Sequence, residues 1–290
     1  MDGKDISLQK YMAFLATVEC GSFTKAAEKL NYSQSGISRM IKDLENEWKV
    51  TLLDRDRNGV YLTSEGKSLM PFAQDVVHSY ERLQAEVDGL TGLKSGIIRI
   101  ATFSSAATHI VPKIIEKFQK DFPGIDYEVL MGEYSEIEQW VSEGRVDCGF
   151  TVLPPDGDFD TISIGEDPYM AVVPAKHPMK DLQKFPIEEF GKEPFMLLEH
   201  GRHEVIADYL SQNGILPKVH FATWEDYAIM SMVERGLGIS IMPKLILKRT
   251  PYRIKAIPLS VPLSREIGII LKNKETASVA TKIFLEYVNS

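Results

Sequence analysis

The sequence is poor in cysteine, has no long apolar run and carries no excess of positive charge. Its 290 residues include only Cys20 and Cys148, so neither a disulfide framework nor a thiolate metal site is expected. No run of about eighteen apolar residues occurs, and the N-terminal segment lacks the basic start and apolar core of a signal peptide. We therefore expect a cytoplasmic protein with no membrane partner.

Signatures of the common enzyme classes are also missing. The sequence holds no Walker loop, no GxSxG elbow, no HExxH zinc motif and no Rossmann glycine fingerprint. The glycines of VERGLGIS, residues 233–240, precede an expected strand rather than a helix, so they do not cradle a phosphate. We therefore expect no catalysis, no cofactor and no metal.

Charge is distributed unevenly along the chain. The formal net charge is -8 and the sequence pI about 5.4, which argues against nonspecific affinity for nucleic acid. Residues 1–63, however, hold nine basic and nine acidic residues, while the remainder holds 24 basic and 32 acidic ones. Because local clustering matters more than the total for docking on phosphates, this first segment is considered by itself.

Three helices are predicted within the first fifty residues. The first starts after a capping Ser7 and ends at Gly21, and the second runs from Ser22 to a turn at residues 31–33. The third is capped by Ser33 and carries a buried stripe at helical spacing, formed by Ile37, Ile41, Leu44 and Trp48. Two short helices joined by a tight turn are typical of a helix-turn-helix DNA reader.

The opposite face of the third helix is polar and partly basic: Gln34, Ser35, Ser38, Arg39 and Lys42. A solvated face is the alternative, but such faces usually mix acidic with basic residues, and here acids begin only at Asp43. Gln and Arg suit the edges of adenine and guanine, so we interpret this face as reading DNA, with Lys42 as a phosphate anchor. Gly36 suits close approach to a partner or, equally, close packing on the first two helices.

A β-hairpin is predicted next, because Asn58-Gly59 separates two short apolar segments. Arg55 on this wing is expected to reach DNA. Arg57 is left open, since Asp54 and Asp56 alternate with the two arginines and can neutralise them.

The segments GSFTKAAEKLNYSQSGISRMIKDLE (21–45) and LLDRDRNGVYLTSEG (52–66) resemble the winged helix-turn-helix of LysR-type transcriptional regulators over about sixty positions. The chain departs from that family at Ser35, Gly36, Trp48-Lys49 and Leu53; Lys49 argues against a left-handed helix end there. The resemblance implies these DNA-binding residues: Thr24, Lys25, Ser33, Gln34, Ser35, Ser38, Arg39, Lys42, Arg55 and Arg57.

A long helix with one apolar seam is predicted after Thr63. The seam consists of Leu69, Phe72, Val76, Tyr80, Leu83, Val87 and Leu90. Burial against its own chain would explain it, but the resemblance implies a linker helix that pairs with a second copy. A homodimer or homotetramer would then meet an imperfectly palindromic operator in double-stranded DNA, with RNA polymerase as a further partner of an activator.

From residue 97 the pattern changes to alternating strands and helices, beginning with IIRIATF (97–103), one long helix over 104–124 and YEVLMG (127–132). The segments EGRVDCGFT (143–151), HPM (177–179) and MVERGLGISIMP (232–243) resemble the effector domain of the same regulators, which is similar to a two-lobed periplasmic solute-binding protein.

The expected architecture is therefore multidomain, α and α/β. It comprises a winged helix-turn-helix (1–63), a linker helix (64–91) and an effector-binding domain (92–290). In that last domain, lobe I covers about 92–163 and 265–290 and lobe II about 164–264.

A ligand is expected between the lobes, at strand ends and helix starts. The candidate effector-binding residues are Ser104, Ser105, Thr151, His200, Arg202, Thr223 and Trp224. Helix capping explains either serine equally well, and a surface position explains His200. The family implies a small organic or amino-acid-like anion; a bare solute-binding protein or an enzyme acting on a small carboxylate would leave the helix-turn-helix unexplained.

Overall fold

The computed structural model describes residues 7–56, 59–90, 96–198 and 205–288. Two compact units are present: residues 1–92 with the short segment 143–145, and residues 93–142 with 146–290. None of the helices in the described ranges is long and apolar enough to cross a membrane.

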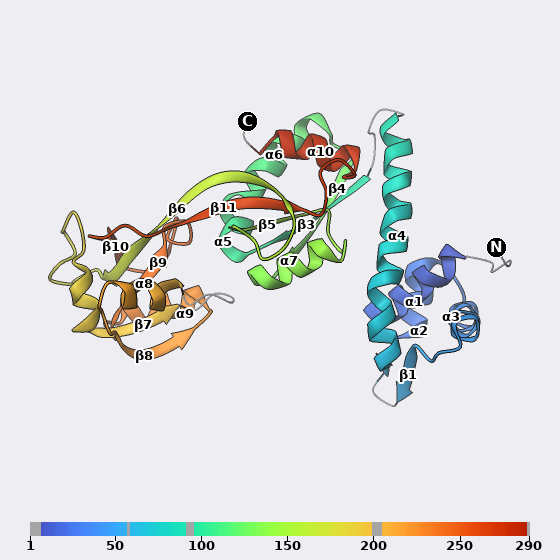
Figure 1. Ribbon diagram of the computed structural model, residues 1–290, viewed down its shortest axis with the longest axis horizontal. Coiled ribbons are helices and arrows are strands. Elements are labelled where there is room, and N and C mark those ends of the chain that lie inside the picture. Colours follow the sequence, from blue (N-terminus) through green and yellow to red (C-terminus); the bar gives the residue numbers. More distant parts are fainter. Residues whose placement is uncertain (1–6, 57–58, 91–95, 199–204, 289–290) are drawn as a thin grey trace. The chain divides into compact units, whose positions relative to one another are not determined.

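The first unit is helical with a two-stranded hairpin (Figure 1). Its elements are α1 (Leu8–Cys20), α2 (Phe23–Leu30), α3 (Gln34–Trp48), β1 (Leu53–Asp56), β2 (Gly59–Leu62) and α4 (Ser64–Leu90). As predicted, Gly21 and Asn31 end α1 and α2 in the left-handed conformation, and the Ser33 side chain caps α3. Ser7 occupies the N-cap position of α1 as predicted, but its side chain makes no capping hydrogen bond.

The end of α3 also differs from the expectation. Lys49 does adopt the left-handed conformation, with φ 58°. Glu45 explains how this position is held: its backbone carbonyl accepts from Val50 N, and its Oε1 accepts from Leu52 N at 2.8 Å. These bonds fix the turn into β1, so they offset the strain that a side chain brings to a positive φ.

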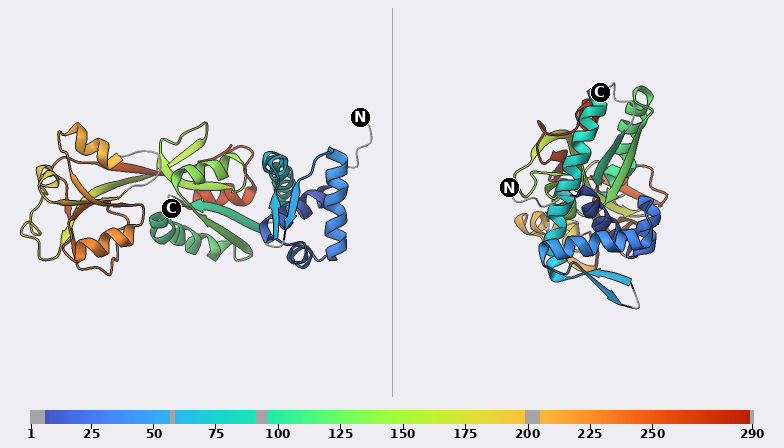
Figure 2. Two further views of the ribbon diagram at one scale, coloured as in Figure 1. Left: turned by 90° about the horizontal axis from the view of Figure 1, so that it is seen from below. Right: turned by 90° about the vertical axis from the view of Figure 1, so that its right-hand side faces the viewer.

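The predicted hairpin is present: β1 and β2 pair antiparallel, from Leu53 opposite Leu62 to Asp56 opposite Gly59. Figure 2 shows it extending away from the helices of its unit. At its base Gly66 approaches the backbone so closely that a Cβ would lie 2.2 Å from the Leu52 carbonyl oxygen. Only glycine therefore lets α4 begin directly beside the wing.

The second unit is built on one mixed sheet with helices on it. Its elements are β3 (Gly96–Thr102), α5 (Ser104–His109), α6 (Val111–Asp121), β4 (Ile125–Met131), α7 (Tyr134–Ser142), β5 (Cys148–Leu153), β6 (Asp160–Pro174), η1 (Ile187–Gly191), β7 (Pro194–Leu198), α8 (Val205–Gln212), β8 (Lys218–Thr223), α9 (Asp226–Glu234), β9 (Ile239–Pro243), β10 (Ile254–Pro258), β11 (Ser264–Leu271) and α10 (Val279–Glu286). The strand order is β4-β3-β5-β11-β6-β9-β7-β8, and β10 pairs with β6.

Two separate hydrophobic cores divide this unit into lobes. One is centred on Phe118, Phe150 and Phe284, and the other on Phe190 and Phe195. Strand β6 belongs to both: residues 160–168 pair with β11, and residues 169–172 pair with β9 (Figure 1). The lobe boundary expected near residue 163 thus falls inside one continuous strand.

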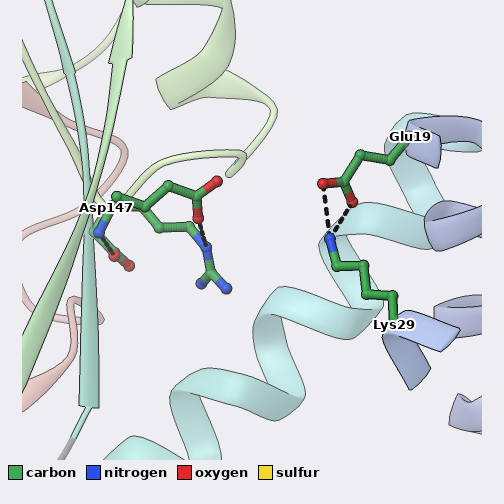
Figure 3. Close-up of polar contacts among 5 residues, drawn as sticks. Glu19, Lys29 and Asp147 are labelled. Carbon is green, nitrogen blue, oxygen red and sulfur yellow. Dashed lines mark hydrogen bonds and ion pairs between the residues drawn. The ribbon is translucent and has the colours of Figure 1, made fainter. Parts of the chain in front are cut away.

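The long helix predicted over 104–124 is wrong. It is divided at Ile110 into α5 and α6, because Pro112 has no N–H to continue the hydrogen bonds of α5. Asp147, just before β5, bonds to β3: its Oδ2 accepts from Arg99 N at 2.7 Å, while Arg99 Nε on β3 donates to Glu128 on β4 at 3.1 Å (Figure 3). The strand β10 had no counterpart in the sequence interpretation.

Candidate nucleic-acid interface and ligand cavity

Helix α3 buries one face and exposes the other. Ile37, Ile41 and Leu44 lie in the core of the first unit, and Trp48 is half-buried with its ring centroid 5.7 Å from that of Tyr11. Burying such side chains stabilises the fold by about 1.5–3 kcal/mol each, which fixes the rotation of the helix. The polar residues opposite them must therefore face outward.

That polar row is accessible. Gln34, Ser35, Arg39 and Lys42 are exposed, and Ser38 is half-buried. The Arg39 side chain is 86% exposed, and its nearest charged partner is Asp43 at 3.9 Å, on the next turn. An exposed pair at that distance contributes little, so the guanidinium can exchange it for another acceptor.

The start of α3 is organised around Ser33. Its Oγ accepts from Gly36 N at 3.1 Å and lies 3.1 Å from Ser35 Oγ. A Cβ at Gly36 would meet only Ser33 Oγ within 4 Å, so close packing on α1 or α2 does not explain this glycine. Two of the predicted serines already hydrogen-bond each other.

The remaining predicted DNA contacts are placed as follows. Thr24 and Lys25 are exposed on α2. Arg55 lies on β1, where the structure describes the backbone but not this side chain. Arg57 lies outside the described residues.

Surface ion pairs join α1 to α2 and to α3. Lys29 Nζ donates to both carboxylate oxygens of Glu19 at 2.7 Å, which joins α2 to α1 (Figure 3). Lys10 pairs with Glu47, which joins α1 to α3. Each pair contributes at most about 1 kcal/mol, but together with the buried stripe they hold α3 in one orientation.

The predicted seam of α4 is exposed along most of its length. Phe72 is 68% and Leu83 61% exposed, and Val76, Tyr80 and Val87 are exposed as well. Leu69 is instead half-buried against the core of the first unit, and the Leu90 side chain is outside the description. Large apolar side chains in one row on a helix favour pairing with another helix.

A cavity of about 770 Å³ lies between the two lobes of the second unit. Strand ends and helix starts converge on it, as predicted for a ligand site. Its lining is Phe103, Ser104, Ser105, Met131, Gly132, Glu133, Tyr134, Ser135, Glu136, Trp224, Glu225, Asp226, Pro243, Ile246 and Arg265.

Arg265 organises this cavity from within, although only 6% of it is exposed. Its Nη2 and Nε donate to Asp167 Oδ2 at 2.8 and 3.0 Å, and its Nη1 donates to Tyr134 Oη at 2.6 Å. Nη2 also donates to Ser105 Oγ at 3.2 Å, and Cζ lies 5.1 Å from the Phe103 ring centroid. This hydrogen-bonded set joins β11, β6, α5 and α7, and it holds one wall of the cavity in place.

Arg265 stays charged. Burial works against its charge, but Tyr134, Tyr169 and Asp167 outweigh burial and raise the pKa of the guanidinium. Burial also raises the pKa of Tyr134, against the smaller opposing effect of Arg265, so this phenol keeps its proton. The cavity therefore presents a fixed cation and a neutral phenol.

The predicted effector residues are placed unequally. Ser104, Ser105 and Trp224 line the cavity, and neither serine caps α5, because Phe103 occupies the capping position without a side-chain bond. Thr151 is fully buried, its Oγ1 has no partner within the described ranges, and Thr223 Oγ1 accepts from Glu225 N at 3.2 Å. Neither threonine lines the cavity among the described residues; His200 and Arg202 lie outside them.

Sequence reasoning missed Arg265, Tyr134 and Asp167. One signal was available: Arg265 stands just before the apolar run from Ile267 to Leu271, where a charge that becomes buried needs a partner. Its partners are 98 and 131 residues away, so nothing local in the sequence identifies them.

Comparisons with known proteins cover most of the chain. The LysR substrate binding domain matches residues 91–290, and the bacterial regulatory helix-turn-helix protein of the lysR family matches residues 8–67. The probable HTH-type transcriptional regulator LrrA of Synechococcus elongatus is 33% identical over 265 residues, which cover 91% of this chain and 90% of that protein.

Solved structures share the fold. A full-length OxyR variant from Pseudomonas aeruginosa has a TM-score of 0.78 at 19% identity, covering 98% of this chain and 95% of that one. Full-length CbnR complexed with its target DNA has a TM-score of 0.72 at 20% identity, covering 98% and 99%.

Proposed function

Because this chain belongs to the LysR family of bacterial transcriptional regulators, we propose that it reads an operator with α3 and responds to a small molecule in the interlobe cavity. The relatives are regulators rather than enzymes, which removes the alternative of an enzyme acting on a small carboxylate. Since its target is chromosomal DNA, we place its action in the cytoplasm.

The exposed polar row of α3 is the observation that carries this proposal. Gln34 and Arg39 reach base edges in the major groove, because their planar groups match adenine and guanine. Lys42 contacts a phosphate, and Thr24 and Lys25 of α2 contact the backbone nearby. Gly36 lets the helix start approach the groove closely. Arg55 and Arg57 of the wing add flanking phosphate or minor-groove contacts.

A second copy of the chain pairs with the first through the α4 seam. Pairing of two seams by their exposed apolar side chains buries Phe72, Val76, Tyr80, Leu83 and Val87, and it places two α3 helices on one operator. An imperfect palindrome follows from the two-fold symmetry. Tetramers arise if such dimers pair further.

The lining of the interlobe cavity restricts its ligand. Within the described part of the lining, Arg265 is the basic side chain, and Glu133, Glu136, Glu225 and Asp226 are acidic. A carboxylate directed at Arg265 and an amine or hydroxyl directed at the acids would match this pattern, which favours an amino-acid-like ligand over a simple dianion. Trp224 and Phe103 suit an apolar portion.

Both lobes contribute to the cavity, so a bound ligand favours the lobe arrangement that contacts it best. The spacing of the two α3 helices, and with it the bend of the DNA, would change with that arrangement. This mechanism is equally compatible with activation and with repression of transcription.

The proposal is tested by binding the full chain to DNA fragments from upstream of its own and neighbouring genes, over a salt series. We expect tight binding to one fragment, with affinity that falls steeply as salt rises. Lys42→Ala should lower the salt slope by about 1 without changing which fragment is preferred. Lys176→Ala, which removes the same charge from an exposed site on the other unit, is the matched control.

Equal, weak binding to every fragment, unchanged by Lys42→Ala, would contradict the assignment of α3. For the ligand, a thermal-shift screen of amino acids and small organic acids should give a stabilised complex. Trp224→Ala should weaken that complex about tenfold while leaving the fold intact, because Trp224 is 66% exposed.

A further inference from the structure

A second cavity, of about 430 Å³, lies in the same unit but has a different lining. Its polar side chains come from α5, α6, β6, the segment after β9 and the residue after α10. They are His109, Lys113, Lys117, Glu166, Asp167, Lys244, Lys248 and Tyr287. Nothing in the proposed regulatory mechanism uses this cavity.

Positive charge dominates its lining. Four lysines face it, against Glu166 and the Asp167 carboxylate that is already paired with Arg265. None of the ion pairs found in the described ranges includes Lys113, Lys244 or Lys248. In a chain of net charge -8, such a concentration of cations produces a local positive field that attracts anions.

The titration of His109 reports the same positive field. Its pKa is lowered, first because burial desolvates the ring and then because Lys248, Arg249 and Lys113 oppose a further positive charge. The imidazole is therefore neutral at pH 7, and it can donate or accept a hydrogen bond beside the lysines.

The cations come from both lobes. Lys113 and Lys117 lie on α6, which packs on the first lobe's core. Lys244 and Lys248 lie on the segment after β9, in which Leu245 belongs to the first lobe's core and Ile246 to the second lobe's core. Four ammonium groups on two different segments match a molecule with two or more anionic groups better than a molecule with one.

We propose that this second cavity binds a small polyanion, a molecule bearing several phosphate or carboxylate groups, at a site separate from the interlobe cavity. Lys113 and Lys248 are its principal ligands, one from each lobe, and Lys117 and Lys244 complete the charge. The lysines are exposed, so screening makes the affinity depend strongly on ionic strength.

The structure also connects this site to the interlobe cavity. Asp167 lines the second cavity, and its Oδ2 holds Arg265, which lines the first. Asp167 Oδ1 accepts from Leu245 N at 2.8 Å, and the segment around Leu245 serves both cavities: Pro243 and Ile246 line the first, Lys244 and Lys248 the second. A polyanion that draws Lys244 and Lys248 toward α6 therefore moves the wall of the effector site.

Isothermal titration of the full chain with pyrophosphate at low ionic strength tests the site, and citrate distinguishes carboxylate from phosphate groups. We expect saturable binding of one molecule per chain. The double variant Lys113→Gln/Lys248→Gln should weaken binding at least tenfold. Lys176→Gln/Lys218→Gln removes equal charge from exposed lysines elsewhere in the unit and should leave binding unchanged.

Absence of saturable binding, or equal weakening in both double variants, would overturn the proposed site. Tight DNA binding that is lost only in Lys113→Gln/Lys248→Gln would also overturn it, in favour of a nucleic-acid contact. The pyrophosphate and citrate titrations contain no operator DNA, so failure of the proposed second site is distinguishable from failure of the proposed function.

The coupling between the two cavities is measured by the fluorescence emission of Trp224. The background variant is Trp48→Phe/Trp140→Phe, in which Trp224 is the single tryptophan. Pyrophosphate should shift its emission, and the shift should disappear in Lys113→Gln/Lys248→Gln. Binding that leaves the emission of Trp224 unchanged would overturn the coupling.

Discussion

The two units carry their functional residues in opposite ways. In the first unit, the row from Gln34 to Lys42 is exposed and lies on one helix, and the core beneath it is made of other residues. In the second unit, Arg265, Asp167 and Tyr134 are joined by hydrogen bonds within a mostly buried cluster and come from distant parts of the chain. On the proposed function, contacting a partner and holding the fold are thus separable tasks in the first unit and inseparable in the second.

This difference follows from the ligands. A DNA groove is an external surface, so its partner side chains must project into solvent. A small molecule has to be enclosed, so the groups that contact it must be buried, and a buried charge needs its own partner. Substitutions in the two units should therefore separate into effects on binding alone and effects on binding together with stability.

The largest effect is expected on α4, whose exposed seam is proposed to pair the two copies. Phe72→Glu with Leu83→Glu should give a folded monomer, because both side chains are exposed, and should lower operator affinity at least about 100-fold through lost avidity. Sedimentation and DNA titration measure both results. Ser68→Glu, exposed on the same helix outside the seam, is the control.

Substitutions in the buried ion pair of Asp167 and Arg265 should affect ligand binding and stability together. Asp167→Ala leaves Arg265 without its partner and should lower the free energy of unfolding by about 3–5 kcal/mol. The double variant Asp167→Leu/Arg265→Met should be less destabilised than Asp167→Ala, because no unpaired charge remains. Denaturant unfolding tests this order, and a double variant worse than the single one would contradict it.

Gln34→Ala should affect DNA binding without affecting stability. Loss of a bidentate contact to a base should lower operator affinity by about 1–3 kcal/mol and relax the preference at one base pair. The free energy of unfolding should stay within about 0.5 kcal/mol, since Gln34 is exposed. Selection from a randomised operator library measures the preference, and an unchanged preference would place Gln34 outside the groove.

The smallest effect is expected from pH at His109. Its folded pKa lies below the unfolded value near 6.5, so the unfolded state binds the proton more tightly. The stabilisation is complete above that unfolded value and is lost as pH falls toward the lower folded pKa. His109→Gln should flatten the decline in stability from pH 7 to pH 5, measured by denaturant unfolding, and an unaltered slope would contradict this assignment.

The sequence predicted the first unit well because its signals are local. Gly21, Asn31 and Ser33 define helix ends within a few residues, and the stripe of Ile37 and Ile41 determines which face is buried. Lys49 was the exception, because the contact that holds its left-handed conformation comes from the Glu45 side chain across the turn.

The second unit was predicted only in outline. Strand order places Ser104, Ser105 and Trp224 at the cavity, and their positions at strand ends were enough to suggest this. The alternation of β5 could not show that Thr151 is fully buried away from the cavity lining, and no local pattern joins Arg265 to Asp167 across 98 residues. Long-range pairing decides the chemistry of this cavity, and pairing is not written in local periodicity.

The most direct test of the account is the ratio of affinities of Arg39→Ala for the preferred fragment and for a scrambled one, measured beside the unaltered chain. The account predicts that this ratio falls by about 5- to 150-fold while the melting temperature is unchanged, because Arg39 is 86% exposed and reads a base. An unchanged ratio would show that the polar face of α3 is only solvated and that sequence is read elsewhere.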